Sequence, residues 1–325
     1  MKKFLAKVVL FCLIVFIIVN VINQYYCYLN PNSNDETKRF NDMPAKIEIC
    51  NFGSSHGLYA FNYEDVDDEY ECFNFAFNSQ RPSYDYRLLE NYKDSISEGA
   101  IVFIPVSYFV FFGVSEEKDE NFMARNKRYY YILPFYRIKG FDFHTWLEVK
   151  YPSLFEKEKL FETLSGNSKT MDELDSVDEV WYRISSDIDV EEDAQKAYKR
   201  HLVDGKIDEN GDRIINEDEI DAVVKLIRLC KDINARPILI IPPYLREYIE
   251  EIENKESGFF EEFDEILEDI INQTDVECYD YSRDERFLDS YDLFMNADHL
   301  NIYGAREFTG ILMDEVVGNT VFENV

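Results

Sequence analysis

The sequence has few basic residues for its size. Its 34 Lys and Arg face 65 Asp and Glu, which gives a formal charge of −31 at pH 7. A field of this sign repels phosphate backbones and anionic lipid head groups, so the composition excludes nucleic acid as a natural partner. The charge either keeps the protein soluble or attracts a cationic partner.

Cysteine is also scarce, and no two cysteines form a Cys-x-x-Cys pair. Cys12 and Cys27 lie in or just after an apolar run near the N-terminus. The other four lie inside apolar periodic segments, at Cys50, Cys72, Cys230 and Cys278. This placement is typical of buried free thiols rather than of a disulfide framework, and the sequence predicts no metal and no cofactor.

Apolar residues are plentiful, with 46% hydrophobic and 16% aromatic content, which excludes a disordered chain. We expect one globular domain of roughly 280 residues behind an N-terminal extension. The expected layout is a membrane anchor at 1–27, a linker at 28–45 and a domain at 46–325, with an insertion at about 109–215.

The N-terminal extension is apolar from Phe4 to Ile22 except at Lys7 and Asn20. At about 1.5 Å per residue, this run nearly matches a hydrocarbon core of about 30 Å. Lysines precede the run and an acidic chain follows it, so the domain is expected outside the cytoplasm. No small-x-small cleavage site follows Ile22, which favours a single-pass anchor in the cell membrane over a removable signal peptide.

Strand-like and helix-like segments alternate at both ends of the expected domain. The helix at 217–232 has the clearest pattern, with Asn216 as N-cap and Glu219 placed as in a capping box. We therefore predict a flavodoxin-like three-layer α/β/α fold with a mostly parallel sheet. The expected strands are 46–52, 70–75, 100–108, 236–242 and 276–281, and the expected helices are 84–92, 217–232, 259–271 and 305–317.

Residues 109–215 break the alternation and are predicted to form a mostly helical insertion after the third strand. Its aromatic side chains either line a cleft or pack it against the core. At 208–219, oxygen-bearing side chains occupy the first, third, fifth and twelfth positions of a calcium loop. Arg213 stands at the sixth position, where such a loop needs Gly, so a polar turn with a helix cap is the alternative.

Two motifs offer catalytic side chains. Gly53-Ser54-Ser55 follows the first expected strand, at the sheet edge where open α/β folds bind ligands. A Ser on such a turn is exposed and close to backbone N–H groups that can face an oxyanion, although the motif alone also fits an ordinary turn. Near the C-terminus, Asp298 and His299 can supply a general base and the group that orients it, although an isolated loop His is commonly a surface residue.

Three blocks in this order resemble the SGNH/GDSL hydrolase superfamily. They are Gly53-Ser-Ser55, Asn74-Phe-Ala-Phe-Asn-Ser-Gln80 and Asp298-His-Leu-Asn-x-x-Gly-Ala305. The apolar N-terminus and the long insertion are similar to a membrane-tethered branch that includes teichoic-acid D-alanyl-transfer and alginate O-acetylation proteins. The resemblance spans roughly residues 46 to 317 without the insertion. It implies Ser55 as the nucleophile and His299 as the general base.

The resemblance also implies three oxyanion donors. They are the Ser55 N–H, a backbone N–H near Ser79 or Gln80, and an Asn side chain. The usual Gly of the second block is Ser79 here, and no Gly-x-Asn-Asp follows the third strand. Asn74 and Asn78 are the candidates for the amide donor, with one of them expected to satisfy loop backbone groups instead.

The group that orients His299 is open between two residues. The family places its acid three residues before the His, where this chain has Asn296. We favour Asp298, with the carbonyl of Asn296 as the alternative acceptor. His56, next to Ser55, either contacts substrate or packs within the first turn of a helix.

We therefore expect an extracytoplasmic enzyme that forms an acyl-Ser55 intermediate. Its acceptor is expected to be a hydroxyl of an acylated cell-surface glycan or wall polymer, or water. The resemblance implies a membrane-bound acyltransferase as partner, and tethering favours transfer over hydrolysis. The alternative is a non-catalytic membrane-tethered binding or scaffold protein with an SGNH-like pocket.

Overall fold

The computed structural model describes residues 1–30, 35–66, 69–114, 125–165 and 181–318. Parts of the expected linker (31–34) and insertion (115–124 and 166–180) lie outside the described residues. The chain forms two compact units, of which unit 1 comprises residues 1–42 and 121–175 and unit 2 comprises residues 43–120 and 176–325. The stretch expected as one insertion is thus divided, because only its middle belongs with the N-terminal residues.

Unit 1 is helical in its described residues. Helix α1 (Lys2–Leu29) continues past residue 27 and is long and apolar enough to cross a membrane, with a mean hydropathy of 2.9 over its most apolar window. The other helices of unit 1 are α2 (Asp35–Lys38), α6 (Tyr129–Ile132), α7 (Phe143–Lys150) and α8 (Lys157–Leu164), with short 3-10 turns η1 (Arg39–Asn41), η4 (Phe135–Arg137) and η5 (Pro152–Leu154).

Unit 2 is built on a five-stranded parallel sheet in the order β2-β1-β3-β4-β5. This strand order is that of the flavodoxin-like folds, so the predicted fold class is confirmed. The strands are β1 (Ile47–Asn51), β2 (Cys72–Asn74), β3 (Ile96–Pro105), β4 (Arg236–Ile241) and β5 (Glu277–Asp280). Each predicted strand is present, and β2 and β5, at the edges of the sheet, are shorter than expected.

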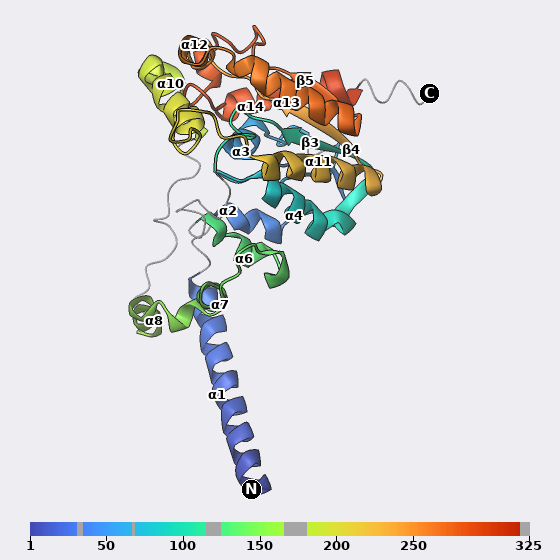
Figure 1. The fold of residues 1–325 in the computed structure, drawn as a ribbon. Coiled ribbons are helices and arrows are strands. Elements are labelled where there is room, and N and C mark those ends of the chain that lie inside the picture. Colours follow the sequence, from blue (N-terminus) through green and yellow to red (C-terminus); the bar gives the residue numbers. More distant parts are fainter. Residues whose placement is uncertain (31–34, 67–68, 115–124, 166–180, 319–325) are drawn as a thin grey trace. The chain divides into compact units, whose positions relative to one another are not determined.

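Helices cover both faces of the sheet (Figure 1). Helix α14 contacts α3, whereas α11 contacts both α4 and α13. The helices of unit 2 are α3 (Ser55–Ala60), α4 (Pro82–Tyr92), α10 (Val190–Tyr198), α11 (Glu217–Asp232), α12 (Arg246–Lys255), α13 (Phe259–Thr274) and α14 (Ile302–Leu312), with short turns η2 (Lys93–Ser95), η7 (Ser185–Asp187), η8 (Lys199–Val203), η9 (Tyr291–Leu293) and η10 (Met313–Val317).

The helix boundaries follow from their caps. Helix α11 has the predicted bounds, and the Asn216 side chain accepts a hydrogen bond from the N–H of Glu219. Helix α14 begins at Ile302 rather than at residue 305. Asn301 caps it there by accepting hydrogen bonds from the N–H groups of Tyr303 and Gly304.

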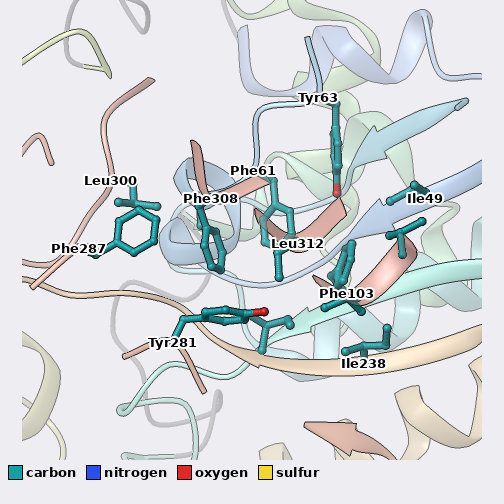
Figure 2. Packing of buried hydrophobic residues seen from close by; sticks show 14 of the residues in the cluster. Ile49, Phe61, Tyr63, Phe103, Ile238, Tyr281, Phe287, Leu300, Phe308 and Leu312 are labelled. Carbon is teal, nitrogen blue, oxygen red and sulfur yellow. The ribbon is translucent and has the colours of Figure 1, made fainter. Parts of the chain in front are cut away.

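The core beside α14 is rich in aromatic side chains, as Figure 2 shows. The ring of Phe61 lies 5.5 Å from that of Phe103 on β3 and 6.1 Å from that of Phe308 on α14. All three side chains are buried, and each contributes roughly 1.5–3 kcal/mol by leaving water. This packing fixes the start of α14, and the loop before it, against the sheet.

The loop at 208–219 does not gather its expected calcium ligands. The Glu219 carboxylate accepts hydrogen bonds from the Ser83 N–H (2.9 Å) and hydroxyl (3.2 Å), at the N-terminus of α4. Asp208 instead accepts from the N–H groups of Asn210 and Asp212 in its own turn. The alternative of a polar turn followed by a helix cap is the one that these contacts support.

Candidate active site

Ser55 lies on a tight turn between β1 and α3. Gly53 has φ = +109°, a conformation that only glycine adopts without strain, and its N–H donates to Asp85 Oδ1 at 3.0 Å. Ser54 is the N-cap, so Ser55 opens the helix and its N–H is among those without an intrahelical partner. The Ser55 residue is partly exposed at the carboxyl end of β1.

The loop that carries His299 is fixed from both sides. The Asn301 side-chain amide donates to the carbonyls of Asp292 (2.7 Å) and Arg183 (3.1 Å). Gly304 packs so closely on the preceding loop that an added Cβ would lie 2.0 Å from the Leu293 carbonyl oxygen. The backbone before α14 therefore has little freedom to move.

The structure brings Ser55 and His299 together. Nε2 of His299 lies 2.8 Å from Ser55 Oγ, and Nδ1 lies 3.1 Å from Asn296 Oδ1 and 3.2 Å from Asp298 Oδ2. With two oxygen acceptors at Nδ1, the proton belongs on that nitrogen. Nε2 is then free to accept the Ser55 hydroxyl proton.

Both candidates for orienting His299 reach the imidazole, but they differ in their other contacts and in charge. Asn296 Oδ1 also accepts from the backbone N–H of His299 (2.8 Å) and of Asp298 (3.3 Å), so it shapes the loop as well as touching the ring. Asp298 brings the negative charge that an imidazolium requires, and its side chain is fully buried.

Asp298 lies among polar side chains of α3 and η8. Its Oδ2 lies 3.1 Å from His56 Nε2, 3.4 Å from the Arg200 guanidinium and 3.7 Å from His201 Nε2. Burial alone raises the pKa of this carboxyl, but the attraction and hydrogen bonds of His299 and His56 outweigh it and hold the pKa well below its ordinary value. Asp298 therefore stays ionised.

His56 is buried against this carboxylate and does not face outward. Its Nδ1 lies 2.7 Å from Ser107 Oγ, and only 2% of the residue is exposed. Burial, together with the charge of His299, lowers the pKa of His56 to about 4, so the ring is neutral at pH 7. Of the two expected roles, substrate contact or packing in the helix, the geometry supports packing.

His201 and Arg200 are the site residues that sequence reasoning missed. Both lie in η8, within the stretch predicted to be an insertion. His201 Nδ1 lies 2.9 Å from the Tyr248 hydroxyl, and burial lowers the pKa of His201 well below its ordinary value. The one available signal was composition, because three of the chain's four histidines meet at this carboxylate.

The side-chain amides of Asn74 and Gln80 donate to acceptors within the protein. The Asn74 amide donates to the carbonyls of Gly57 (3.3 Å) and Leu58 (3.2 Å), which ties β2 to α3. The Gln80 amide donates to Asp85 Oδ1 at 2.6 Å and is buried. The Asn74 side chain therefore does not support an oxyanion role. The donor expected at Gln80 was its backbone N–H, which donates to the Phe77 carbonyl at 3.0 Å.

Asn78 and Ser79 lie on the turn that follows β2. The Phe77 N–H donates to the Gly53 carbonyl at 3.2 Å, which places this turn beside the Ser55 turn. Asn78 is partly exposed and its amide donates to the Tyr59 hydroxyl at 3.4 Å. Ser79 is exposed and has φ = 55°, a left-handed conformation that glycine adopts more easily than serine.

An aromatic pair lies beside His299. The Tyr59 ring stands edge-on to His299 at 5.6 Å, and Trp181 lies 6.2 Å from Tyr59. Both residues are partly exposed. They give one side of the site an apolar surface.

His56, Asp298 and His299 are also close enough to hold a metal ion, with ligand atoms within 4.8 Å of one another. The same atoms already pair as His56 Nε2 with Asp298 Oδ2 and His299 Nδ1 with Asp298 Oδ2. A metal ion would replace the protons of these pairs, and the arrangement fits a hydrogen-bonded network.

No known protein family and no curated protein matches the sequence. Several solved structures resemble the chain, among them the following three. A protein provisionally named acylhydrolase from Bacteroides fragilis has 9% identity and a TM-score of 0.41, covering 89% of this chain and 97% of its own. A protein provisionally named platelet activating factor from Streptococcus pneumoniae has 12% identity and a TM-score of 0.38, covering 95% of this chain and 97% of its own. A protein provisionally named GDSL-like lipase from Parabacteroides merdae has 10% identity and a TM-score of 0.36, covering 84% of this chain and 97% of its own. Likeness at this level does not bear on activity.

Proposed function

We propose that the chain is a serine esterase or O-acyltransferase of the SGNH type, tethered to the cell membrane with unit 2 outside the cytoplasm. The observation that carries the proposal is the 2.8 Å contact between Ser55 Oγ and His299 Nε2, together with the acceptors at His299 Nδ1. A Ser hydroxyl is a weak nucleophile without a positioned base. This geometry supplies the base.

The first half of the reaction would form an acyl-enzyme. As Ser55 Oγ attacks an ester carbonyl, His299 Nε2 takes its proton, and the ionised Asp298 stabilises the imidazolium that results. The carbonyl oxygen becomes an oxyanion facing the Ser55 N–H and the turn at Asn78 and Ser79. When the ester C–O bond breaks, His299 returns the proton to the leaving alcohol.

The second half would reverse these roles. His299 removes a proton from an incoming hydroxyl, whose oxygen attacks the acyl carbonyl and releases Ser55. Water as acceptor gives hydrolysis, and a hydroxyl of a surface glycan gives transfer. The apolar face of Tyr59 and Trp181 suits a sugar ring or acyl chain, and a tethered enzyme meets wall polymers and a membrane-bound acyltransferase at high effective concentration.

Fluorophosphonate labelling tests the proposal. The wild-type chain should form a covalent adduct, and Ser55→Ala should abolish it. His299→Ala should remove most labelling because the base is lost. Ser54→Ala is the matched control: Ser54 is buried and makes no side-chain cap hydrogen bond, so labelling should persist.

Full labelling of the His299→Ala protein would leave the alternative of a non-catalytic binding or scaffold protein. Where labelling behaves as expected, acyl transfer from an activated ester to an oligosaccharide, measured against release of free acid, separates transferase from esterase.

A further inference from the structure

Unit 1 exposes a concentrated group of large apolar side chains. Between residues 135 and 164, eight such side chains are exposed, and the most exposed are Phe161 (79%), Tyr136 (70%) and Phe143 (61%). Among the described residues of unit 2, only four are exposed to this extent. Isolated exposed apolar residues are ordinary, but a contiguous group indicates an interaction surface.

The exposed group belongs to the segment that holds the C-terminal end of α1. The Asn23 amide donates to the Lys150 carbonyl at 2.9 Å, and Asn23 Oδ1 accepts from the Ser153 hydroxyl at 2.8 Å. The Tyr26 hydroxyl donates to Glu156 at 2.6 Å. Figure 1 shows α7 and α8 beside this end of α1.

These contacts lie at the end of the apolar run. The Tyr151 hydroxyl donates to Asn20 Oδ1 at 3.5 Å, and the bonds at Asn23 and Tyr26 follow directly after Ile22. A helix that spans a bilayer leaves the hydrocarbon at the end of such a run. The segment bound at Asn23 and Tyr26 is therefore at the depth of the lipid head groups. Aromatic side chains are enriched at this depth, because their rings suit a layer that is apolar on one side and wet on the other.

The two units differ in net charge. Unit 1 has 14 Lys and Arg against 11 Asp and Glu, whereas unit 2 has 20 against 54. Anionic head groups therefore repel unit 2, whereas they do not repel the slightly basic unit 1. The unit that contains α1 is therefore slightly basic, and the same unit carries the exposed aromatic group.

We propose that residues 135–164 form an interfacial collar that lies in the head-group layer around the end of α1, with Phe143 and Phe161 inserted among the lipids. The collar goes beyond the proposed enzymatic function and rests on α1 spanning the bilayer. A lipid surface is favoured over a protein partner because the collar is continuous with α1.

Depth-dependent fluorescence quenching tests the collar in the full-length chain, reconstituted into phosphatidylcholine vesicles. In a background with Trp146→Phe and Trp181→Phe, single tryptophans are introduced by Phe161→Trp in the collar, Ile14→Trp in α1 and Tyr303→Trp in unit 2. Lipids brominated near the head group or near the bilayer centre serve as quenchers. Phe161→Trp should lose most emission to the shallow bromines and Ile14→Trp to the deep ones, while Tyr303→Trp should be quenched little by either.

The collar is overturned if Phe161→Trp is quenched no more than Tyr303→Trp, the result expected of a surface for a protein partner. It is equally overturned if Ile14→Trp escapes deep quenching or if Phe161→Trp follows the deep bromines. Should the double-phenylalanine background fold poorly, Trp181→Phe alone leaves Trp146, whose ring stacks on Phe143 at 5.6 Å, as a native probe. Shallow quenching of Trp146 is then expected, and its absence counts against the collar. None of these readouts depends on Ser55 chemistry.

Discussion

Nε2 of His56 lies 3.1 Å from Oδ2 of Asp298, although 242 positions separate the two residues in the sequence. The contact joins the helix that begins with Ser55 to the loop that carries His299. Ser55 and His299 are therefore linked twice, once directly and once through this buried pair.

Asp298→Asn should lower kcat/KM by about a hundred-fold or more, because a neutral amide cannot stabilise the imidazolium and its NH2 can turn toward Nδ1. Asn296→Ala should cost only about tenfold, since Asp298 Oδ2 still lies 3.2 Å from Nδ1. Steady-state kinetics on an activated ester measure both. The reverse ranking would reassign the orienting role to Asn296.

His56→Phe should lower kcat with little change in KM, because His56 is buried and positions Asp298 without touching substrate. His56→Gln, which can still donate to Asp298, should recover part of the loss. A purely structural role would instead lower folded protein in both variants and leave kcat per folded molecule unchanged, so kinetics are normalised to folded protein by circular dichroism.

Unit 2 should lose stability as the pH falls from about 6.5 toward 4. His56, with its pKa lowered to about 4, and His201 bind protons more readily in the unfolded chain, so their stabilisation is complete above pH 6.5. Each contributes a slope of about 1.4 kcal/mol per pH unit. The pH dependence of Asp85 has the opposite sign and offsets the slope of one histidine. Burial raises the pKa of Asp85 to about 7, so its contribution to the stability of unit 2 is lost as the pH rises from 4 to 7. Urea unfolding at pH 7 and pH 5 measures the difference, and a stability that rises toward pH 5 would contradict the assignment. The double variant His56→Gln, His201→Gln should remove the rise in stability between pH 5 and 7.

Two glycines of α14 should respond in opposite directions to alanine. Gly304→Ala should destabilise the fold by about 1–3 kcal/mol and lower activity, because its Cβ would lie 2.0 Å from the Leu293 carbonyl oxygen and push the His299 loop away. At Gly310 an added Cβ meets nothing within 4 Å, so Gly310→Ala should stabilise the helix by about 0.5–1 kcal/mol. Thermal unfolding and ester hydrolysis measured on both variants check the pair. Equal effects would contradict the close packing at Gly304.

Much of the fold was predictable because it follows from local patterns. Apolar runs at 100–108 and 236–242 marked β3 and β4, and the cap at Asn216 marked the start of α11. The start of α14 was placed too late, because the cap at Asn301 was not used.

The candidate site was predictable only in part. The order of the three sequence blocks, through their resemblance to the SGNH/GDSL superfamily, pointed to Ser55 and His299, and the structure brings these two residues within 2.8 Å. The partners of Asp298 were not predictable, since His201 and Arg200 come from a stretch without strand alternation, and only tertiary packing brings them to the carboxylate. The assignment of 121–175 to the unit of α1 depends on polar contacts such as Asn23 with Ser153, which leave no periodic pattern in the sequence.

Because unit 1 is made of two separate stretches of the chain, a single protease cut does not by itself separate unit 2 from α1. The chain passes between the units three times, after residues 42, 120 and 175. A protease that cuts once between residues 42 and 43 separates α1 covalently from everything that follows. Residues 143–156 would still be held to the severed helix by the hydrogen bonds at Asn23 and Tyr26. Proteolytic release of unit 2 therefore requires either that unit 1 comes apart or that the chain is also cut at the two later crossings.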